Sequence, residues 1–167
     1  MSKNRHTSET PATHWLRQQR IPFGEHPYDY VDRGGARESA RQLGVPLHQV
    51  AKTLIMEDEQ ARPLIVIMHG DCEVSTKNLA RQTGVKRIAP CTPDTAQRHS
   101  GYQVGGTSPF ATRRRMPVWI EETLIEYPEI YINGGRRGYL ISIAPDALVR
   151  ALDAKAVRVA LGGGEGN

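Results

Sequence analysis

The chain has 167 residues, of which 38% are hydrophobic and 24% are charged, and its formal net charge at pH 7 is +4. This length fits one domain with its own core and is too short for two ordinary domains. No apolar run of about 18 residues occurs, so neither a membrane span nor wholesale disorder is expected. Residues 1–11 lack the apolar stretch of a secretory signal, so we expect a cytoplasmic protein.

The first elements predicted along the chain are a helix, an extended segment and a second helix. The pair Thr10-Pro11 is typical of a helix start, and an apolar stripe follows it toward Arg20. Prolines and aromatic residues over 21–30 indicate a strand or an extended segment. A helix over 36–43 is then expected to end at Gly44.

The rest of the chain predicts a β-hairpin, two capped helices and several short strands. The hairpin joins apolar strands over 50–56 and 63–68. Polar caps and closing glycines predict helices from Ser75 or Thr76 to Gly84 and from Thr92-Pro93 to Gly101. Further strands are expected over 85–89, 116–120, 129–133, 139–143 and 157–161, with a helix over 145–152.

These elements predict an α/β (α+β) fold. Helices and strands are interleaved, but hairpins are too frequent for a purely parallel sheet. We therefore expect a single domain with a mixed, mostly antiparallel and partly barrel-like sheet and helices packed around it. The domain is expected to span residues 10–161, between a flexible N-terminus (1–9) and a flexible tail (162–167).

A glycine-rich loop over 104–110 is the most informative local feature. Its two glycines allow positive φ and a close approach to the main chain, while Pro109 removes one N–H donor. The N–H groups of Gly106, Thr107 and Ser108 could therefore bind an anion or a carbonyl oxygen. A tight connection between two strands is the alternative interpretation.

Basic residues are concentrated around this loop. Residues 77–115 contain eight lysines and arginines against Asp94 alone, a net charge of +7. Such a zone is typical of a phosphate-binding surface, although a solvated surface would have the same composition. The run Arg113-Arg114-Arg115, which follows the loop, favours phosphate binding.

Lys52 is the strongest single candidate for a functional residue. Period-two alternation places it on the same face of its strand as Val50, Leu54 and Met56. Burial of an unpaired ammonium is costly, so Lys52 either reaches solvent at the rim or faces a polar cavity. In a cavity it would suit a carbonyl oxygen or a phosphate.

The common catalytic motifs are absent. Ser108 is followed by Pro109 and Phe110, which do not fit a G-x-S-x-G nucleophile elbow, and no P-loop or H-E-x-x-H pattern occurs. Cys72 and Cys91 show no metal-ligand spacing and are expected to stay free. We therefore expect neither a metal nor a cofactor. Asn133 could hydrogen-bond at a pocket mouth, and Tyr28 belongs either to the core or to a pocket wall. The glycine-rich turn 134–138 could simply join two strands, although its two arginines could hold phosphates.

Three motifs together resemble the YbaK/EbsC-type aminoacyl-tRNA deacylases, free-standing relatives of the editing domain of bacterial prolyl-tRNA synthetases. They are Val50-Ala-Lys-Thr-Leu-Ile55, the segment from Ala96 to Pro109, and Ile130-Tyr-Ile-Asn-Gly-Gly-Arg-Arg-Gly138. The resemblance implies hydrolysis of the ester between a wrongly attached amino acid and the 3′-terminal adenosine of tRNA. It makes Lys52 the key active-site residue and Gly105–Pro109 the loop that binds the aminoacyl end.

The implied site can be stated residue by residue. Catalytic residues would be Lys52, Gly105, Gly106, Thr107 and Ser108. Substrate-binding residues would be Tyr28, Thr53, Pro109, Asn133 and Gly134. The acceptor end of tRNA would contact Arg113, Arg114, Arg115, Arg136 and Arg137. An aminoacyl-tRNA synthetase is a further candidate partner.

Departures from the family pattern concern the amino acid removed. In the members that act on cysteinyl-tRNA a phenylalanine forms a pocket wall, and residues 33–36 stand there in this chain. Asn133 stands where the family has a serine, and Leu140 stands where it has an aspartate. More polar groups near the loop favour serine or threonine, with cysteine and alanine still open. The alternative function is a non-catalytic module that binds tRNA or a nucleotide.

Overall fold

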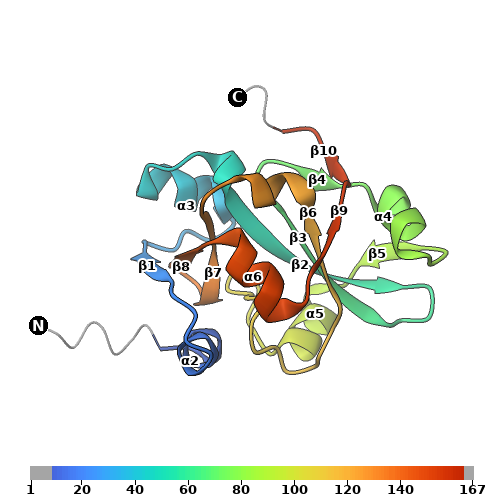
Figure 1. Cartoon of the computed structure of the whole chain (residues 1–167), viewed down its shortest axis with the longest axis horizontal. Helices are drawn as coiled ribbons and strands as arrows, with labels where there is room; N and C mark the ends of the chain where they lie inside the picture. Colours follow the sequence, from blue (N-terminus) through green and yellow to red (C-terminus); the bar gives the residue numbers. More distant parts are fainter. Residues whose placement is uncertain (1–8, 164–167) are drawn as a thin grey trace, which may run out of the picture.

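The computed structural model describes residues 9–163, which form a mixed sheet with helices on both faces (Figure 1). The eight-stranded sheet has the order β1-β8-β7-β2-β3-β6-β9, and β5 also pairs with β2. A separate two-stranded sheet joins β10 to β4. Among these residues, none of the helices has the length and apolar character needed to cross a membrane.

The helices begin and end where the local signals indicate. The side chains of Thr10, Ser75 and Thr92 accept the N-terminal capping hydrogen bonds of their helices. Gly44 and Gly84 end helices in the left-handed conformation. The helices are α2 (Pro11–Gln18), α3 (Gly35–Leu43), α4 (Thr76–Thr83), α5 (Pro93–Ser100) and α6 (Pro145–Leu152), with 3-10 turns η1 (Leu47–Gln49) and η2 (Glu122–Glu126).

The predicted hairpin and most predicted strands are present. The strands are β1 (Gly24–Pro27), β2 (Val50–Asp58), β3 (Pro63–His69), β4 (Glu73–Val74), β5 (Ile88–Pro90), β6 (Val118–Glu121), β7 (Ile130–Arg136), β8 (Tyr139–Ile143), β9 (Lys155–Val157) and β10 (Ala160–Leu161). Within the eight-stranded sheet four pairings are antiparallel and three are parallel, which confirms a mixed, mostly antiparallel sheet.

Three expectations differ from the structure. The sheet is not closed into a barrel, because β1 and β9 are its two ends and do not pair with each other. The expected turn over 134–138 is mostly strand: β7 continues to Arg136 through a bulge between Asn133 and Arg136. The expected strand 157–161 is divided into β9 and β10, because the Val159 N–H donates to the Glu121 carboxylate, 2.8 Å away.

The termini expected to be flexible lie mostly outside the described residues, which exclude 1–8 and 164–167. Glu9 is described, and its carboxylate forms an ion pair with Arg17 on α2.

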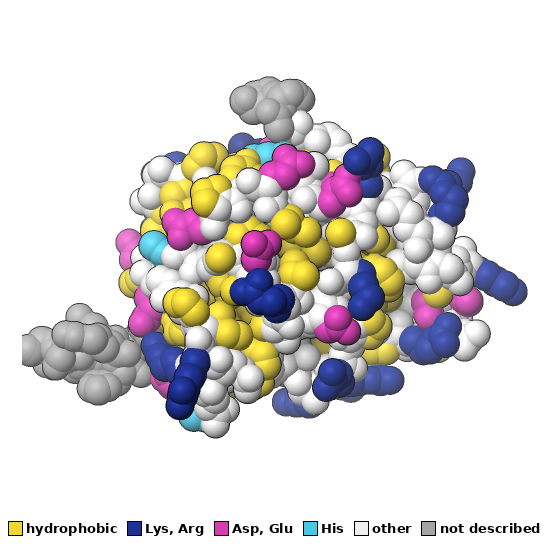
Figure 2. Space-filling view, viewed as in Figure 1, with side chains coloured by type: hydrophobic (Ala, Val, Ile, Leu, Met, Phe, Trp, Pro, Cys, Tyr) yellow, Lys and Arg dark blue, Asp and Glu magenta, His cyan; other side chains and the backbone are white. Residues whose placement is uncertain are grey.

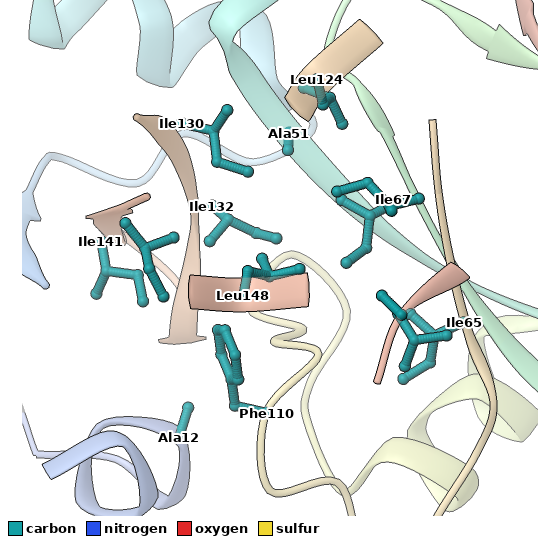
Figure 3. Close-up of a cluster of buried hydrophobic side chains, with 14 of the residues drawn as sticks. Ala12, Ala51, Ile65, Ile67, Phe110, Leu124, Ile130, Ile132, Ile141 and Leu148 are labelled. Atoms are coloured by element: carbon teal, nitrogen blue, oxygen red, sulfur yellow. The ribbon is translucent and has the colours of Figure 1, made fainter. Parts of the chain in front are cut away.

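The main core lies between the sheet, α2 and α6. Phe110 is fully buried there and stacks on Trp15, with ring centroids 6.0 Å apart. Figure 3 shows Phe110 between Ala12 on α2 and Leu148 on α6, with Ile132 nearby. Because Phe110 ends the glycine-rich loop, its burial anchors one end of that loop to the core.

A buried histidine network attaches η1 to the sheet. The side chain of His69 is fully buried; its Nδ1 donates to the His48 carbonyl oxygen at 2.6 Å, and its Nε2 lies 2.6 Å from Thr123 Oγ1. The rings of His48 and His69 stack with centroids 3.6 Å apart. Burial lowers the pKa of His69, so the folded protein favours its neutral form.

This network predicts acid sensitivity of the fold. The pKa of His69 is lower in the folded than in the unfolded chain. The stability that His69 contributes to the fold is therefore complete above about pH 6.5 and is lost as the pH falls below that value. The free energy of unfolding, measured with urea, should fall less between pH 7.5 and pH 5.5 for His69→Gln than for the parent protein. Gln18→Ala, on the exposed face of α2, removes no titratable group and should keep the parent's pH dependence. An unchanged pH dependence in His69→Gln would contradict this assignment.

Candidate active site

The site forms where two neighbouring strands of the sheet separate. β2 and β7 pair only through Val50 with Tyr131 and Ala51 with Ile132. β5 joins the same edge of β2 only from Met56 onward. The stretch of β2 between these pairings therefore has no strand beside it on that edge.

The main chain of Thr53 faces this gap. The Val50 carbonyl accepts from the Gly70 N–H on the β3 side, so alternate residues of β2 direct their main-chain groups toward the opposite edge. The Ile55 carbonyl, on that edge, accepts from the Cys91 N–H at 3.0 Å. Thr53 lies between Ala51 and Ile55, so its N–H and C=O point into the opening.

A pocket of about 590 Å³ occupies the opening. Its walls come from the segment between β1 and α3, the first turns of α3, the start of β2, the glycine-rich loop and the β7–β8 hairpin. Among the residues predicted from the sequence, Tyr28, Lys52, Thr53, Gly105, Thr107, Asn133 and Arg137 line it.

Lys52 interrupts an apolar row because different helices cover the two ends of that row. Val50 packs with Ala40 of α3, while Met56 packs with Leu79 of α4. Lys52 lies between these clusters, half-buried in the pocket wall. Among residues 9–163 no carboxylate lies within 4.0 Å of its ammonium group. The charge is therefore available to a ligand.

The glycine-rich loop packs closely on the β7–β8 hairpin. A Cβ on Gly106 would lie 2.7 Å from the Arg136 carbonyl carbon and the Arg137 nitrogen, so only glycine fits there. Asn133 Nδ2 donates to the Gly105 carbonyl at 3.3 Å, and Arg137 Nε donates to the Val104 carbonyl at 2.9 Å. These contacts hold the loop beside the open edge of β2.

The structure changes which N–H groups of the loop are available. The expected donor Gly106 is occupied, because its N–H closes a turn onto the Gln103 carbonyl at 2.8 Å. The N–H groups of Gly105, Thr107 and Ser108 have no protein acceptor within residues 9–163. Gly105 and Thr107 line the pocket, so their N–H groups are the candidate donors.

Ser108, Pro109 and Gly134 do not line the pocket. Ser108 is fully buried, and its Oγ accepts from the Phe110 N–H at 3.0 Å. Pro109 is buried beside it. Gly134 packs against the Tyr139 ring, and its carbonyl accepts from Thr10 Oγ1 at 2.6 Å. These three residues support the loop and hairpin from within the core.

The candidate tRNA-binding arginines lie in different surroundings. Arg137 lines the pocket with its guanidinium over the Tyr30 ring, 4.9 Å from the centroid. Arg136 lies over the Tyr139 ring instead, at 4.7 Å. Arg113, Arg114 and Arg115 are exposed beyond the pocket. On the face shown in Figure 2, Lys and Arg side chains gather along the right and lower margins, where α4 and α5 lie in Figure 1.

Several pocket residues had no individual signal in the sequence. Tyr30 contacts Gly105 and stacks with Arg137, while Ser39 and Gly70 line the inner wall. The segment 33–36 and Leu140, singled out by the family comparison in the sequence, do contribute wall residues. The side chain of Tyr28 is half-buried, and this burial raises its pKa, so the phenol stays protonated at neutral pH.

Comparisons with known proteins agree with this geometry. A family model described as the aminoacyl-tRNA editing domain matches residues 33–151. EbsC of Enterococcus faecalis, named as a proposed Cys-tRNA(Pro)/Cys-tRNA(Cys) deacylase, is 27% identical over 150 residues, which are 89% of this chain and 92% of EbsC. A proline–tRNA ligase of Limosilactobacillus fermentum is 21% identical over 106 residues, 61% of this chain and 18% of the ligase.

Solved structures share the fold. Hypothetical protein APE2540 superposes with a TM-score of 0.84 and 22% identity, covering 91% of this chain and 100% of that chain. A structure described as a proposed trans-editing enzyme for prolyl tRNA synthetase has a TM-score of 0.78 and 21% identity, covering 92% and 99%. With the family model matched over most of the described domain, the chain belongs to the aminoacyl-tRNA editing domain family.

Proposed function

We propose that this protein is a trans-editing hydrolase that deacylates tRNA carrying a small, wrongly attached amino acid. The observation that carries the proposal is the unpaired Lys52 ammonium in a pocket that also contains the free N–H groups of Gly105 and Thr107. A cation and two unpaired main-chain donors in one pocket suit an ester carbonyl whose oxygen becomes negative during hydrolysis.

The reaction needs no protein nucleophile. Water attacks the ester carbon, and the N–H groups of Gly105 and Thr107 stabilise the oxyanion that forms. The bond to the ribose oxygen then breaks, that oxygen takes up a proton, and the free amino acid and the terminal hydroxyl are released. Lys52 supplies positive charge and positions the acyl end. Attack by a neighbouring ribose hydroxyl or by a substrate thiol would use the same donors.

The open edge of β2 offers a place for the α-ammonium group of the amino acid. The Thr53 carbonyl points into the gap between the pairings of β2 with β7 and β5. An ammonium donating to this carbonyl would place the ester near the glycine-rich loop. This contact would distinguish an aminoacyl ester from a simple ester.

The pocket favours a small side chain with a polar end. Its inner wall combines Ala36, Val50 and Leu140 with the hydroxyl-bearing residues Tyr28 and Ser39. Serine or threonine would satisfy both kinds of wall, and this remains our preferred substrate class. Cysteine, which appears in the name of the Enterococcus relative, is the main competitor, and alanine is also small enough.

The basic zone over residues 77–115 supports two further proposals. It would bind the phosphates of the tRNA acceptor stem, giving affinity with little sequence readout. If the pocket lacked activity, the same zone would make the protein a non-catalytic tRNA-binding module. The match to part of a proline–tRNA ligase makes a synthetase a candidate partner.

Replacement of Lys52 tests the catalytic proposal. Lys52→Met keeps the side-chain length and suits the apolar row, so the fold should remain while kcat/KM for deacylation falls about 100-fold or more. The measurement is release of amino acid from a panel of Ser-, Thr-, Cys- and Ala-tRNA. Lys155→Ala, which removes an exposed lysine on β9, should leave the rate unchanged. If the parent protein released no amino acid from any of these tRNAs, the proposed function would be contradicted.

Gly106→Ala tests the position of the loop. The added Cβ collides with the β7–β8 hairpin, so the loop must move, and a shift of about 1 Å should lower deacylation roughly 100-fold. The control is Gly84→Ala, which strains a left-handed helix end where no atom lies within 4 Å of the new Cβ. That variant should lose about 1–2 kcal/mol of stability but keep its activity. Full activity in Gly106→Ala would disprove the role of the close approach.

Simultaneous replacement of Arg113, Arg114 and Arg115 by serine tests the tRNA surface. Binding of uncharged tRNA should weaken, and the slope of log K against log salt should fall in magnitude by about 2–3. A control triple variant of Arg41, Arg62 and Arg150, all exposed outside the basic zone, should retain the parent slope. Equal slopes in both triple variants would place the tRNA contacts elsewhere.

A further inference from the structure

A second group of chemically active side chains lies at the opposite end of β2 from Lys52. Glu57 belongs to β2, Cys91 to the connection between β5 and α5, and His99 to the last turn of α5. One potential ligand atom from each residue lies within 4.8 Å of the other two. Glu57 Oε2 and His99 Nε2 are 2.9 Å apart, and the Cys91 thiol lies within 4.8 Å of both.

These distances suit a tetrahedral metal ion. Zinc bonds of about 2.0 Å to N and O and 2.3 Å to S place neighbouring ligand atoms about 3.3–3.6 Å apart. Small side-chain movements within the observed cluster would reach that spacing. Glu57 and His99 retain 28% and 8% side-chain exposure, so the cluster is enclosed but open to an incoming ion.

The charges balance as well. A glutamate and a cysteine thiolate together neutralise a divalent ion, and a neutral histidine completes a mixed O, S and N set typical of zinc. Without an ion, burial and the neighbouring Glu57 carboxylate raise the pKa of Cys91 to about 11. The thiol is then protonated at neutral pH, which makes it a poor nucleophile. A metal would displace that proton on binding.

A second cluster, formed by His48, His69 and Asp71, does not meet the geometric requirement. The imidazole planes of its histidines are only 7° from parallel, with centroids 3.6 Å apart. A metal lies close to the plane of each imidazole that binds it, and two stacked planes do not meet at a common point. Both ring nitrogens of His69 are also engaged, with His48 and Thr123.

Helix α5 gives an independent reason for an anchor at the first cluster. Its sequence, PDTAQRHS, contains no large apolar residue, and its buried residues are His99 and Ser100. Cys91 stands just before its N-cap and His99 in its last turn, so both ends of the helix meet Glu57 on β2. The main-chain carbonyls of His99 and Ser100 also accept from Arg114 and Arg113.

We propose that Glu57, Cys91 and His99 form a zinc site with three protein ligands and a water, which fastens both ends of α5 to β2. The site is separate from the candidate active site. Lys52 and Glu57 are five steps apart along the extended strand β2, a distance of about 17 Å. The proposed zinc site holds α5, the helix that precedes the glycine-rich loop. The three ligands come from separate segments, which is why no short metal-binding motif is visible in the sequence.

The test is a titration of the metal-free, full-length protein with Co²⁺, followed by Zn²⁺. We expect one equivalent of Co²⁺ to produce a thiolate charge-transfer band with the visible bands of tetrahedral cobalt, and Zn²⁺ to abolish them. Saturating Zn²⁺ should also raise the melting temperature by about 5 °C or more. Absence of both the bands and the shift in the parent protein would overturn the proposal.

Matched variants locate the ion. Cys91→Ser and His99→Gln should lose the charge-transfer band and the thermal shift, and Gln can still hydrogen-bond Glu57 if the serine variant folds poorly. Cys72→Ser should keep both, although burial raises the pKa of that thiol to about 11 as well. Loss of the band in Cys72→Ser but not in Cys91→Ser would assign the ion to another site and reject the proposal. Lys52→Met should bind zinc normally, which separates this test from that of the deacylase.

Discussion

The candidate site depends on the separation of β2 from β7 after two residue pairs. Pairing stops at Ala51 and Ile132, and the bulge between Asn133 and Arg136 then turns β7 away. Gly106 lets the glycine-rich loop approach the main chain of the β7–β8 hairpin, because it has no Cβ. The free backbone edge of β2 is a consequence of this divergence, and the close approach of the loop to the hairpin places its free N–H groups in the same pocket.

Removing the Lys52 ammonium from water costs free energy, and the arrangement of the helices on this face of β2 lowers that cost. α3 covers Val50 and α4 covers Met56, so neither helix covers the lysine between them. If one long helix crossed this face, the ammonium would be buried without a partner. Because the apolar face is divided into two parts, the Lys52 ammonium stays partly exposed, and the sheet avoids the desolvation cost of burying it fully.

Local signals predicted the helices well, because caps such as Thr10 and Thr92 and terminating glycines act within a few residues. The sheet class also followed from the sequence, whereas the alternation alone left Lys52 either at the rim or in a cavity, and only the family resemblance favoured the pocket. Long-range geometry could not be predicted: the Gly106 N–H is engaged, Ser108 is buried, and Arg136 and Arg137 lie over different tyrosine rings. The Glu57–Cys91–His99 cluster was missed for the same reason, since its members meet only through the sheet and α5.

The segment from Tyr28 to Ala36 forms one wall of the pocket, yet only its neighbour β1 pairs with the sheet. Its outer residues Val31, Asp32 and Arg33 are exposed. The floor on β2 and the loop beside it are fixed by tight packing instead. Substitutions at these exposed positions would therefore reshape the mouth of the pocket without disturbing its floor.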